Sequence, residues 1–123
     1  MKKVRLQQLA VAELVKRFTE LALQQDEAVL AFDVKETNQL FSKLKEITDE
    51  LKSRPGDQRR ALLPLLAHPN QQVQVRAAKA TLAIAPVAAR QVLETIAELP
   101  YSPQKLDAGM CLWALDEGIF KPT

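Results

Sequence analysis

The chain has 123 residues, of which 47% are hydrophobic and 26% charged, and its formal net charge is only +2. This length favours one domain with a core of its own, and the near balance of charge gives no global field typical of nucleic-acid or membrane binders. The single cysteine, Cys111, excludes an internal disulfide and fits a reducing compartment.

The hydropathy of the chain indicates a cytoplasmic protein. The basic start is followed by an apolar run that Glu13, Lys16 and Arg17 interrupt too early for a signal peptide. No uncharged stretch approaches the roughly 18 apolar residues that a membrane span needs. We therefore expect cytoplasmic localisation.

Glycine and proline divide the chain into two parts. Residues 1–54 contain neither, whereas all three glycines and all seven prolines lie from Pro55 onward. The first part is therefore predicted to hold long helices, and the second part shorter helices separated by turns.

Two long helices are predicted before Pro55. Apolar residues at helical spacing favour one helix over residues 5–31. Asp33 is a natural N-cap for the next helix, and Glu36 completes a capping-box pattern. The apolar stripe of this second helix consists of Leu40, Leu44, Ile47 and Leu51. The short corner between the two helices predicts an antiparallel hairpin over residues 5–53.

Two helices around a His68-Pro69-Asn70 turn are expected next. The first covers residues 58–67, with Pro64 tolerated near its first turn. The second covers residues 71–84, with Asn70 as its N-cap. It is rich in alanine, which lets neighbouring helices approach closely. We expect this pair, residues 57–85, to form the packing centre.

The last predicted pair spans residues 86–120. One helix follows Pro86 over residues 87–98, and another covers residues 104–117 before a stop at Gly118. No segment shows sustained period-two alternation, so no strand is predicted. The fold class is therefore all-α, with about six helices in three antiparallel pairs within one domain of residues 1–123.

The segment Ala61–Leu82 resembles a HEAT-type repeat, a helix pair that stacks into an α–α superhelix. Its pattern is LLPLL, a short turn with proline, and then Val-x-x-x-Ala-Ala-x-Ala-x-Leu. The segments GDQRRALLPLL, HPNQQVQVRAAKATLAIAP and DAGMCLWALDEGIF together resemble the bacterial family of domains of unknown function numbered two thousand and nineteen. The resemblance implies a compact, bacterial, HEAT-like bundle and carries over no catalytic residue.

No arrangement of residues typical of catalysis or cofactor binding is present in the sequence. His68 is the single histidine and has no partner at metal-ligand spacing, which favours a structural role in its turn. Cys111 lies in an apolar stripe and is expected to be a buried, inert thiol. We therefore expect a chain that is not an enzyme and binds no cofactor or metal.

Trp113 and Asp116 are the sharpest local feature, because their i, i+3 spacing places them on one helix face. The pair is loosely similar to the tryptophan and aspartate of HEAT-like DNA glycosylases. The alternative, which we favour, is a tryptophan that covers the end of the core beside a solvated carboxylate.

Charge is segregated in the second half of the chain. From Asp57 to Leu93 five cations face one carboxylate, a net of +4, and from Glu94 to Phe120 one cation faces five carboxylates, a net of −4. The cations that could line a basic groove are Arg59, Arg60, Arg76 and Lys79. The alternative is that these charges merely solvate the surface or pair with each other.

Three hypotheses of function follow. The first is a non-catalytic protein-interaction module, such as an adaptor or an inhibitor or immunity-like partner, that uses this groove or an end of the bundle. The second is a nucleic-acid-binding or base-processing domain that uses the four cations with Trp113 and Asp116, although few aromatic residues are available to stack on bases. The third is a homo-oligomer that forms through the N-terminal hairpin.

Overall fold

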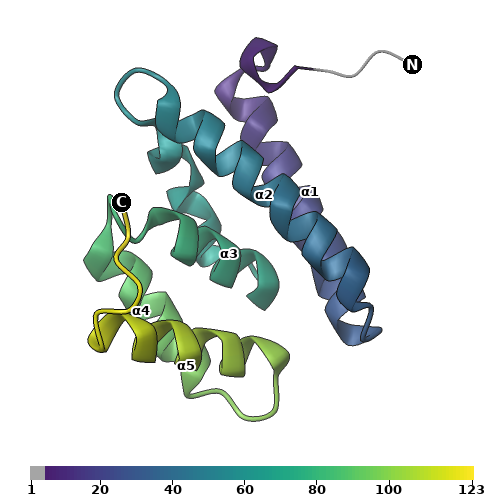
Figure 1. Cartoon of the computed structure of the whole chain (residues 1–123), viewed down its shortest axis with the longest axis vertical. Coiled ribbons are helices and arrows are strands. Elements are labelled where there is room, and N and C mark those ends of the chain that lie inside the picture. The colour runs from purple at the N-terminus through teal and green to yellow at the C-terminus, as the bar shows by residue number, and fades with distance from the viewer. Residues whose placement is uncertain (1–4) are drawn as a thin grey trace. The chain divides into compact units, whose positions relative to one another are not determined.

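Residues 5–123 form an all-helical structure, described here by a computed structural model (Figure 1). The basic start of the chain, residues 1–4, lies outside the described residues. Within residues 5–123 there is no strand, which confirms the all-α prediction. The helices are the two 3₁₀-helices η1 (Leu6–Gln8) and η2 (Gln58–Ala67) and the five α-helices α1 (Val11–Leu30), α2 (Val34–Ser53), α3 (Gln71–Thr81), α4 (Pro86–Ala97) and α5 (Pro103–Asp116). None of these helices is both long enough and apolar enough to cross a membrane.

The helices divide into two compact units, Met1–Ala61 and Leu62–Thr123. The first unit contains η1, α1 and α2, and the second contains α3, α4 and α5, while η2 runs across the boundary. The single domain expected from chain length stays a prediction.

The first unit is built on the predicted antiparallel hairpin of α1 and α2 (Figure 1). The α2 stripe is buried as the sequence predicted. The α1 side chains that are buried are Leu14, Phe18, Ala22, Gln25 and Ala28. Gln25 is the polar member of this set, and it donates from Nε2 to the Thr37 carbonyl of α2 at 3.1 Å. A buried amide needs such a partner, because an unsatisfied polar group would destabilise the fold.

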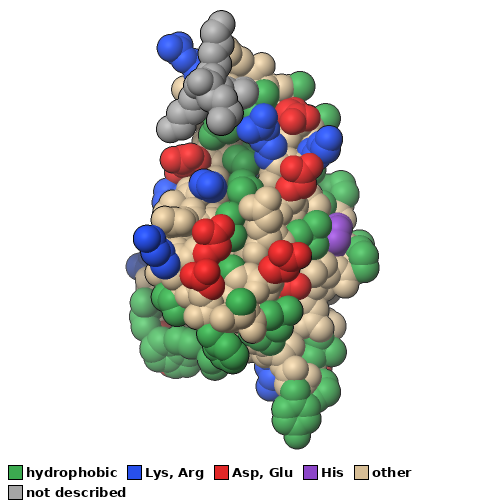
Figure 2. Space-filling view, turned by 90° about the vertical axis from the view of Figure 1, so that its right-hand side faces the viewer, with side chains coloured by type: hydrophobic (Ala, Val, Ile, Leu, Met, Phe, Trp, Pro, Cys, Tyr) green, Lys and Arg blue, Asp and Glu red, His purple; other side chains and the backbone are tan. Residues whose placement is uncertain are grey.

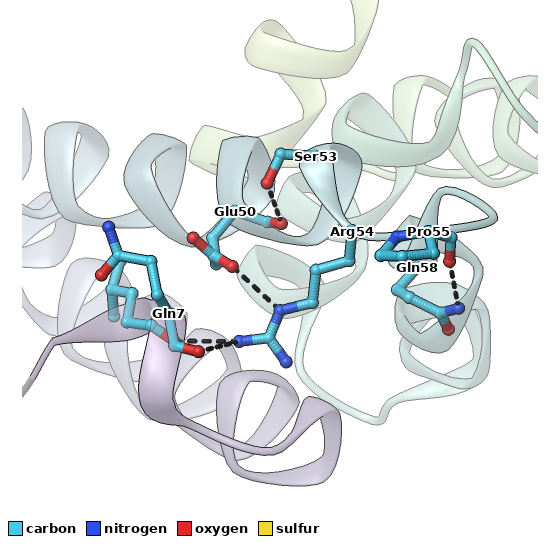
Figure 3. Close-up of polar contacts among 7 residues, drawn as sticks. Gln7, Glu50, Ser53, Arg54, Pro55 and Gln58 are labelled. Atoms are coloured by element: carbon cyan, nitrogen blue, oxygen red, sulfur yellow. Dashed lines mark hydrogen bonds and ion pairs between the residues drawn. The ribbon is translucent and has the colours of Figure 1, made fainter.

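The first α-helix begins later than predicted, at Val11 instead of residue 5. Arg54, just after α2, explains the difference, because its guanidinium donates to the Leu6 carbonyl at 2.9 Å and the Gln7 carbonyl at 3.5 Å (Figure 3). The same side chain pairs with Glu50 at 2.9 Å. These bonds use carbonyl oxygens that a continuous α-helix would bond internally. The chain therefore forms the short η1 turn and then becomes extended at Ala10.

The turn that follows Arg54 is also held by side chains (Figure 3). Ser53 Oγ donates to the Glu50 carbonyl at 2.8 Å, and Gln58 Nε2 donates to the Pro55 carbonyl at 2.8 Å. The last carbonyls of α2 have no helical N–H partner, and the bond from Ser53 satisfies one of them, the carbonyl of Glu50. The predicted stop at residues 54–56 thus has a defined hydrogen-bonded structure.

Phe32 occupies a backbone conformation that usually selects glycine. It has φ 55°, and the bonds from Phe32 N to Val29 O and from Asp33 N to Ala28 O form a Schellman motif. The same motif ends α5, where the corresponding residue is Gly118 with φ 72°. Asp33 then caps α2 by accepting from the Glu36 N–H at 3.0 Å, as predicted. Phe32 therefore carries backbone strain at a cap and leaves its ring 90% exposed.

Replacing Phe32 by glycine is expected to stabilise the chain by about 1 kcal/mol, because glycine removes the left-handed strain. The midpoint of urea unfolding, followed by circular dichroism, measures the change. The matched reverse change is Gly118→Ala, which adds a side chain at the corresponding left-handed position of α5 and should lower the free energy of unfolding by a similar amount. A less stable Phe32→Gly protein would contradict the prediction and show that the ring makes a stabilising contact.

Residues 58–67 are helical as predicted, but the helix is of the 3₁₀ type. Pro64 lies inside it and is exposed. Proline has no N–H, and its ring crowds the carbonyl four residues earlier, so α-helical bonding is disfavoured there.

The turn before α3 is as expected: Asn70 Oδ1 accepts from Val73 N at 3.1 Å, and His68 Nδ1 accepts from Asn70 N at 3.0 Å. His68 thus has a structural role in the turn.

The second unit is organised around α3, which packs against both α4 and α5. Its alanines Ala77 and Ala78 are fully buried, which allows the neighbouring helices to approach closely. The buried cluster of this unit consists of Val75, Ala78, Leu82, Ala89, Leu93, Ile96, Ala108 and Cys111. The helix predicted over residues 71–84 ends at Thr81, whose carbonyl accepts from Ile84 N and Ala85 N in the turn that follows.

Candidate interaction surface

The last helix, α5, has well-defined ends. Ser102 is its N-cap and accepts from Lys105 N at 3.1 Å, and Pro103 is the first helical residue. Proline is favoured at this position because its missing N–H would have no helical partner. At the other end, Ile119 N donates to the Ala114 carbonyl at 2.9 Å across Gly118. The side chains of α5 are therefore displayed on a firmly bounded helix.

Two opposite faces of α5 are apolar. The inner face carries Ala108 and Cys111, which belong to the buried cluster of the second unit. The outer face carries an exposed row, Leu106, Met110 and Trp113, with exposed fractions of 68%, 60% and 57%. The row has i, i+4, i+7 spacing and lies about 180° round the helix from the inner face. We call these three residues the outer stripe.

An open hollow of about 920 Å³ lies beside the outer stripe. Its lining comes from the end of α4, the α4–α5 connection and the outer face of α5, and it consists of Ala97, Glu98, Pro100, Tyr101, Ser102, Lys105, Leu106, Gly109, Met110 and Trp113. Tyr101 is fully exposed, with φ 50°. A Cβ added at Gly109 would have no atom within 4 Å, so the space above this residue is open.

Four carboxylates lie along α4 and at the end of α5, and we call them the acidic rim: Glu94, Glu98, Asp116 and Glu117. Arg90 pairs with Asp116 at 2.9 Å and approaches Glu94 at 3.7 Å. Lys105 directs its ammonium to the Ala97 carbonyl at 2.7 Å. With these two cations against four carboxylates, the region has a net charge of −2, and the carbonyl ends of α4 and α5 add further negative potential.

Arg76 and Lys79 do not form a free basic edge, because both contact Asp107. Lys79 Nζ lies 2.9 Å from Asp107 Oδ1, and Arg76 donates to Oδ2. The side chain of Arg76 is only 11% exposed. Burial by itself would raise the pKa of Asp107, but Arg76 and Lys79 outweigh it and hold the pKa below its usual value. Both cations therefore follow the alternative stated for the sequence, in which the charges of the basic and acidic segments pair with each other.

Arg59 is also engaged by a carboxylate. Its side chain is 8% exposed and donates to Asp57 at 2.9 Å and 2.6 Å. The hydrogen bonds from Arg59 lower the pKa of Asp57 below its usual range. Arg60 is exposed. Both arginines belong to the first unit, whereas the other predicted site residues belong to the second.

On the face shown in Figure 2, lysine and arginine side chains lie among aspartate and glutamate side chains. Within residues 5–123 there is also no group of three or more histidine, cysteine or carboxylate side chains that could hold a metal ion.

Trp113 and Asp116 share α5 as predicted, and both are exposed. Asp116 pairs with Arg90, so its carboxylate belongs to a surface ion pair. Sequence reasoning missed three exposed residues that line the hollow together with Trp113, namely Leu106, Met110 and Tyr101. The i, i+4, i+7 spacing of the outer stripe, opposite the inner face, is the signal that could have found them.

Cys111 is buried, and burial raises the pKa of its thiol above the usual value. We therefore expect the native protein to react with Ellman's reagent about a hundred times more slowly than the protein in guanidinium chloride, because reaction requires local opening. The absorbance of the released thiolate measures both rates. Equal rates would contradict a buried, inert thiol.

Comparison with known proteins places the chain in a family. The family model described as "Domain of unknown function (DUF2019)" matches residues 12–116. The chain belongs to the DUF2019 family. The chain is also similar to a solved structure, that of the protein RPA1889 from Rhodopseudomonas palustris CGA009, with 50% sequence identity and a TM-score of 0.92. That similarity covers 98% of this chain and 100% of the other.

The comparison with curated proteins gave no match, so no activity is transferred to this DUF2019 chain from a relative. The family assignment confirms the resemblance to the family of domains of unknown function that the sequence showed. A function for the chain therefore has to be argued from its own surface.

Proposed function

We propose that this chain is a non-catalytic protein-interaction module whose contact surface is the outer stripe of α5 with its adjoining hollow. The observation that carries the proposal is the exposure of Leu106, Met110 and Trp113 together on one face of a well-bounded helix. Aromatic residues and methionine are enriched at protein interfaces, and contiguous exposed apolar surface marks such sites. The predicted Trp113 belongs to this surface, and Asp116 belongs to its rim.

The alternative of nucleic-acid binding has less support. Arg59, Arg76 and Lys79 each contact a carboxylate, so binding a phosphate would require an existing ion pair to break. The acidic rim near Trp113 would also repel a nucleic-acid backbone. An electrophoretic shift at low salt with single- and double-stranded DNA and RNA tests this alternative directly.

Site-specific photo-crosslinking in the native cell tests the proposal. A benzoylphenylalanine placed at Met110 is expected to give a discrete protein adduct, while the same group at Val87 is not. Val87 is a matched control because it is 72% exposed on α4 and does not line the hollow. Adding Leu106→Glu should abolish the adduct. Identical adducts from both positions, or none from Met110, would overturn the proposal.

A second candidate partner is another copy of the chain, bound through the N-terminal hairpin. The observation that favours it is the exposure of Leu30, Phe32 and Val34 around the α1–α2 turn, at 62%, 90% and 68%. Light scattering at increasing concentration tests this candidate. A constant mass of 13.7 kDa would exclude it.

A further inference from the structure

We infer that the partner segment of the outer stripe is an amphipathic helix with apolar anchors on one face and lysine or arginine residues beside them. This inference rests on the proposed interaction surface and names the chemistry of its occupant. Three features of the second unit carry it: the spacing of the stripe, the open hollow and the charge of the rim.

The dimensions of the stripe match a helix of two turns. Leu106 and Trp113 are seven residues apart, which corresponds to about 10 Å along α5. An amphipathic helix presents anchors at i, i+3 or i+4, and i+7 over the same length. Gly109 leaves open space between the exposed side chains, so an anchor can lie close to the α5 backbone there. Met110 has a flexible and polarizable side chain that adapts to different apolar anchors.

The charge around the hollow favours a partner segment that carries lysine or arginine. Glu98 and Lys105 both line the hollow, but the Lys105 ammonium is bonded to the Ala97 carbonyl, and Glu117 lies one turn beyond Trp113 on the outer face of α5. Within residues 5–123 neither carboxylate has an ion-pair partner, and Arg90 is shared between Glu94 and Asp116. A cationic segment would supply the missing countercharges. A second copy bound face to face would instead bring two acidic rims together, which disfavours self-association at this surface.

The charge also argues against a membrane as the occupant. Surfaces that bind anionic lipids carry lysine and arginine around their apolar residues. Here the acidic rim, counted together with Arg90 and Lys105, has a net charge of −2, so an anionic bilayer would be repelled. A basic amphipathic helix and an anionic vesicle therefore give opposite expectations for the same surface.

Fluorescence titration of the full chain tests the inference, because Trp113 is its single tryptophan and lies in the hollow. The probes are three tryptophan-free peptides of about 18 residues, long enough to form a helix. The first is a leucine–lysine sequence with leucines on one helical face, the second has the same composition with leucines dispersed, and the third replaces lysine by glutamate. Anionic phosphatidylglycerol vesicles are the fourth probe.

We expect the first peptide to shift the Trp113 emission to shorter wavelength and to bind at least about tenfold more tightly than the second and third, with no shift from the vesicles. Met110→Glu should weaken binding of the first peptide by about tenfold or more, whereas the control Val87→Glu should change it by less than about twofold. The double change Glu98→Lys with Glu117→Lys should reverse the preference between the first and third peptides. All these positions are exposed, and circular dichroism checks that each variant remains folded.

Equal binding of the first and second peptides would overturn the inference, because it would show charge attraction without helical anchoring. Stronger binding of the acidic peptide, a shift with the vesicles, or no shift with any probe would overturn it as well. A specific crosslink at Met110 alongside any of these results would leave the protein-interaction proposal standing while rejecting this class of partner. Loss of that crosslink would reject the proposal itself.

Discussion

Replacing Asp107 by asparagine is expected to lower the free energy of unfolding by about 2–3 kcal/mol. The change removes the carboxylate that Arg76 and Lys79 share and leaves an arginine that is only 11% exposed without its charge partner. Breaking a buried ion pair by removing one member costs about 3–5 kcal/mol. We expect a smaller loss because the Asp107 side chain is 31% exposed and solvent can enter the site.

The matched control is Asp116→Asn, the same substitution at the other end of α5. Asp116 is 61% exposed and pairs with Arg90, itself 38% exposed, so its loss should cost no more than about 0.5 kcal/mol. Urea unfolding followed by Trp113 fluorescence compares the two proteins. Equal effects of the two substitutions would show that the Asp107 site is not the stabilising ion-pair centre that its burial indicates.

The difference in unfolding free energy between the wild type and Asp107→Asn, here called the gap, should depend on pH in a defined direction. The folded-state pKa of Asp107 is lowered, so its stabilising contribution is fully present above the unfolded-state pKa of about 3.9. The contribution is lost as pH falls through the lower folded-state value. The gap should therefore stay constant from about pH 7 to about pH 5 and close below about pH 4. A gap that closes near neutral pH would implicate another titrating group.

The helical hairpin of the first unit was predictable because its signals are local. The α2 stripe repeats at helical spacing, and Asp33 with its neighbours forms a cap within one turn, so no distant contact is needed to specify them. The start of α1 was not predictable, because it depends on Arg54 reaching the carbonyl of Leu6, which is 48 residues away. The 3₁₀ geometry of η2 was missed for a different reason. The sequence prediction places Pro64 near a tolerated first turn, but Pro64 lies well inside the helix.

The candidate surface was only partly predictable. Counting charges along the chain gave a basic segment and an acidic segment, but the count could not show that Asp107 of the acidic segment neutralises Arg76 and Lys79 of the basic one. Such cancellation is set by tertiary packing of α3 against α5, which sequence spacing does not report. The outer stripe was hidden because α5 is apolar on two faces, and a periodicity analysis assigns such residues to a core.

Replacing Leu93 by alanine is expected to destabilise the second unit by about 3 kcal/mol. Leu93 is fully buried in the cluster formed by α3, α4 and α5, and its truncation removes apolar contacts and leaves a cavity. The matched control is Leu106→Ala, which removes the same atoms from a side chain that is 68% exposed and should change stability by less than about 0.5 kcal/mol. Equal losses at the two positions would contradict the assignment of core and outer face.

The Leu93→Ala protein also tests the prediction of a single domain. Trp113 reports only on the second unit, whereas circular dichroism reports on all helices, including α1 and α2 of the first unit with 20 residues each. If the chain is one cooperative domain, both signals should follow a single transition that shifts by the same amount. If circular dichroism instead resolves two steps, and only the step that coincides with Trp113 fluorescence moves, the two units unfold independently. The length-based expectation would then be wrong, because each unit would have a stability of its own.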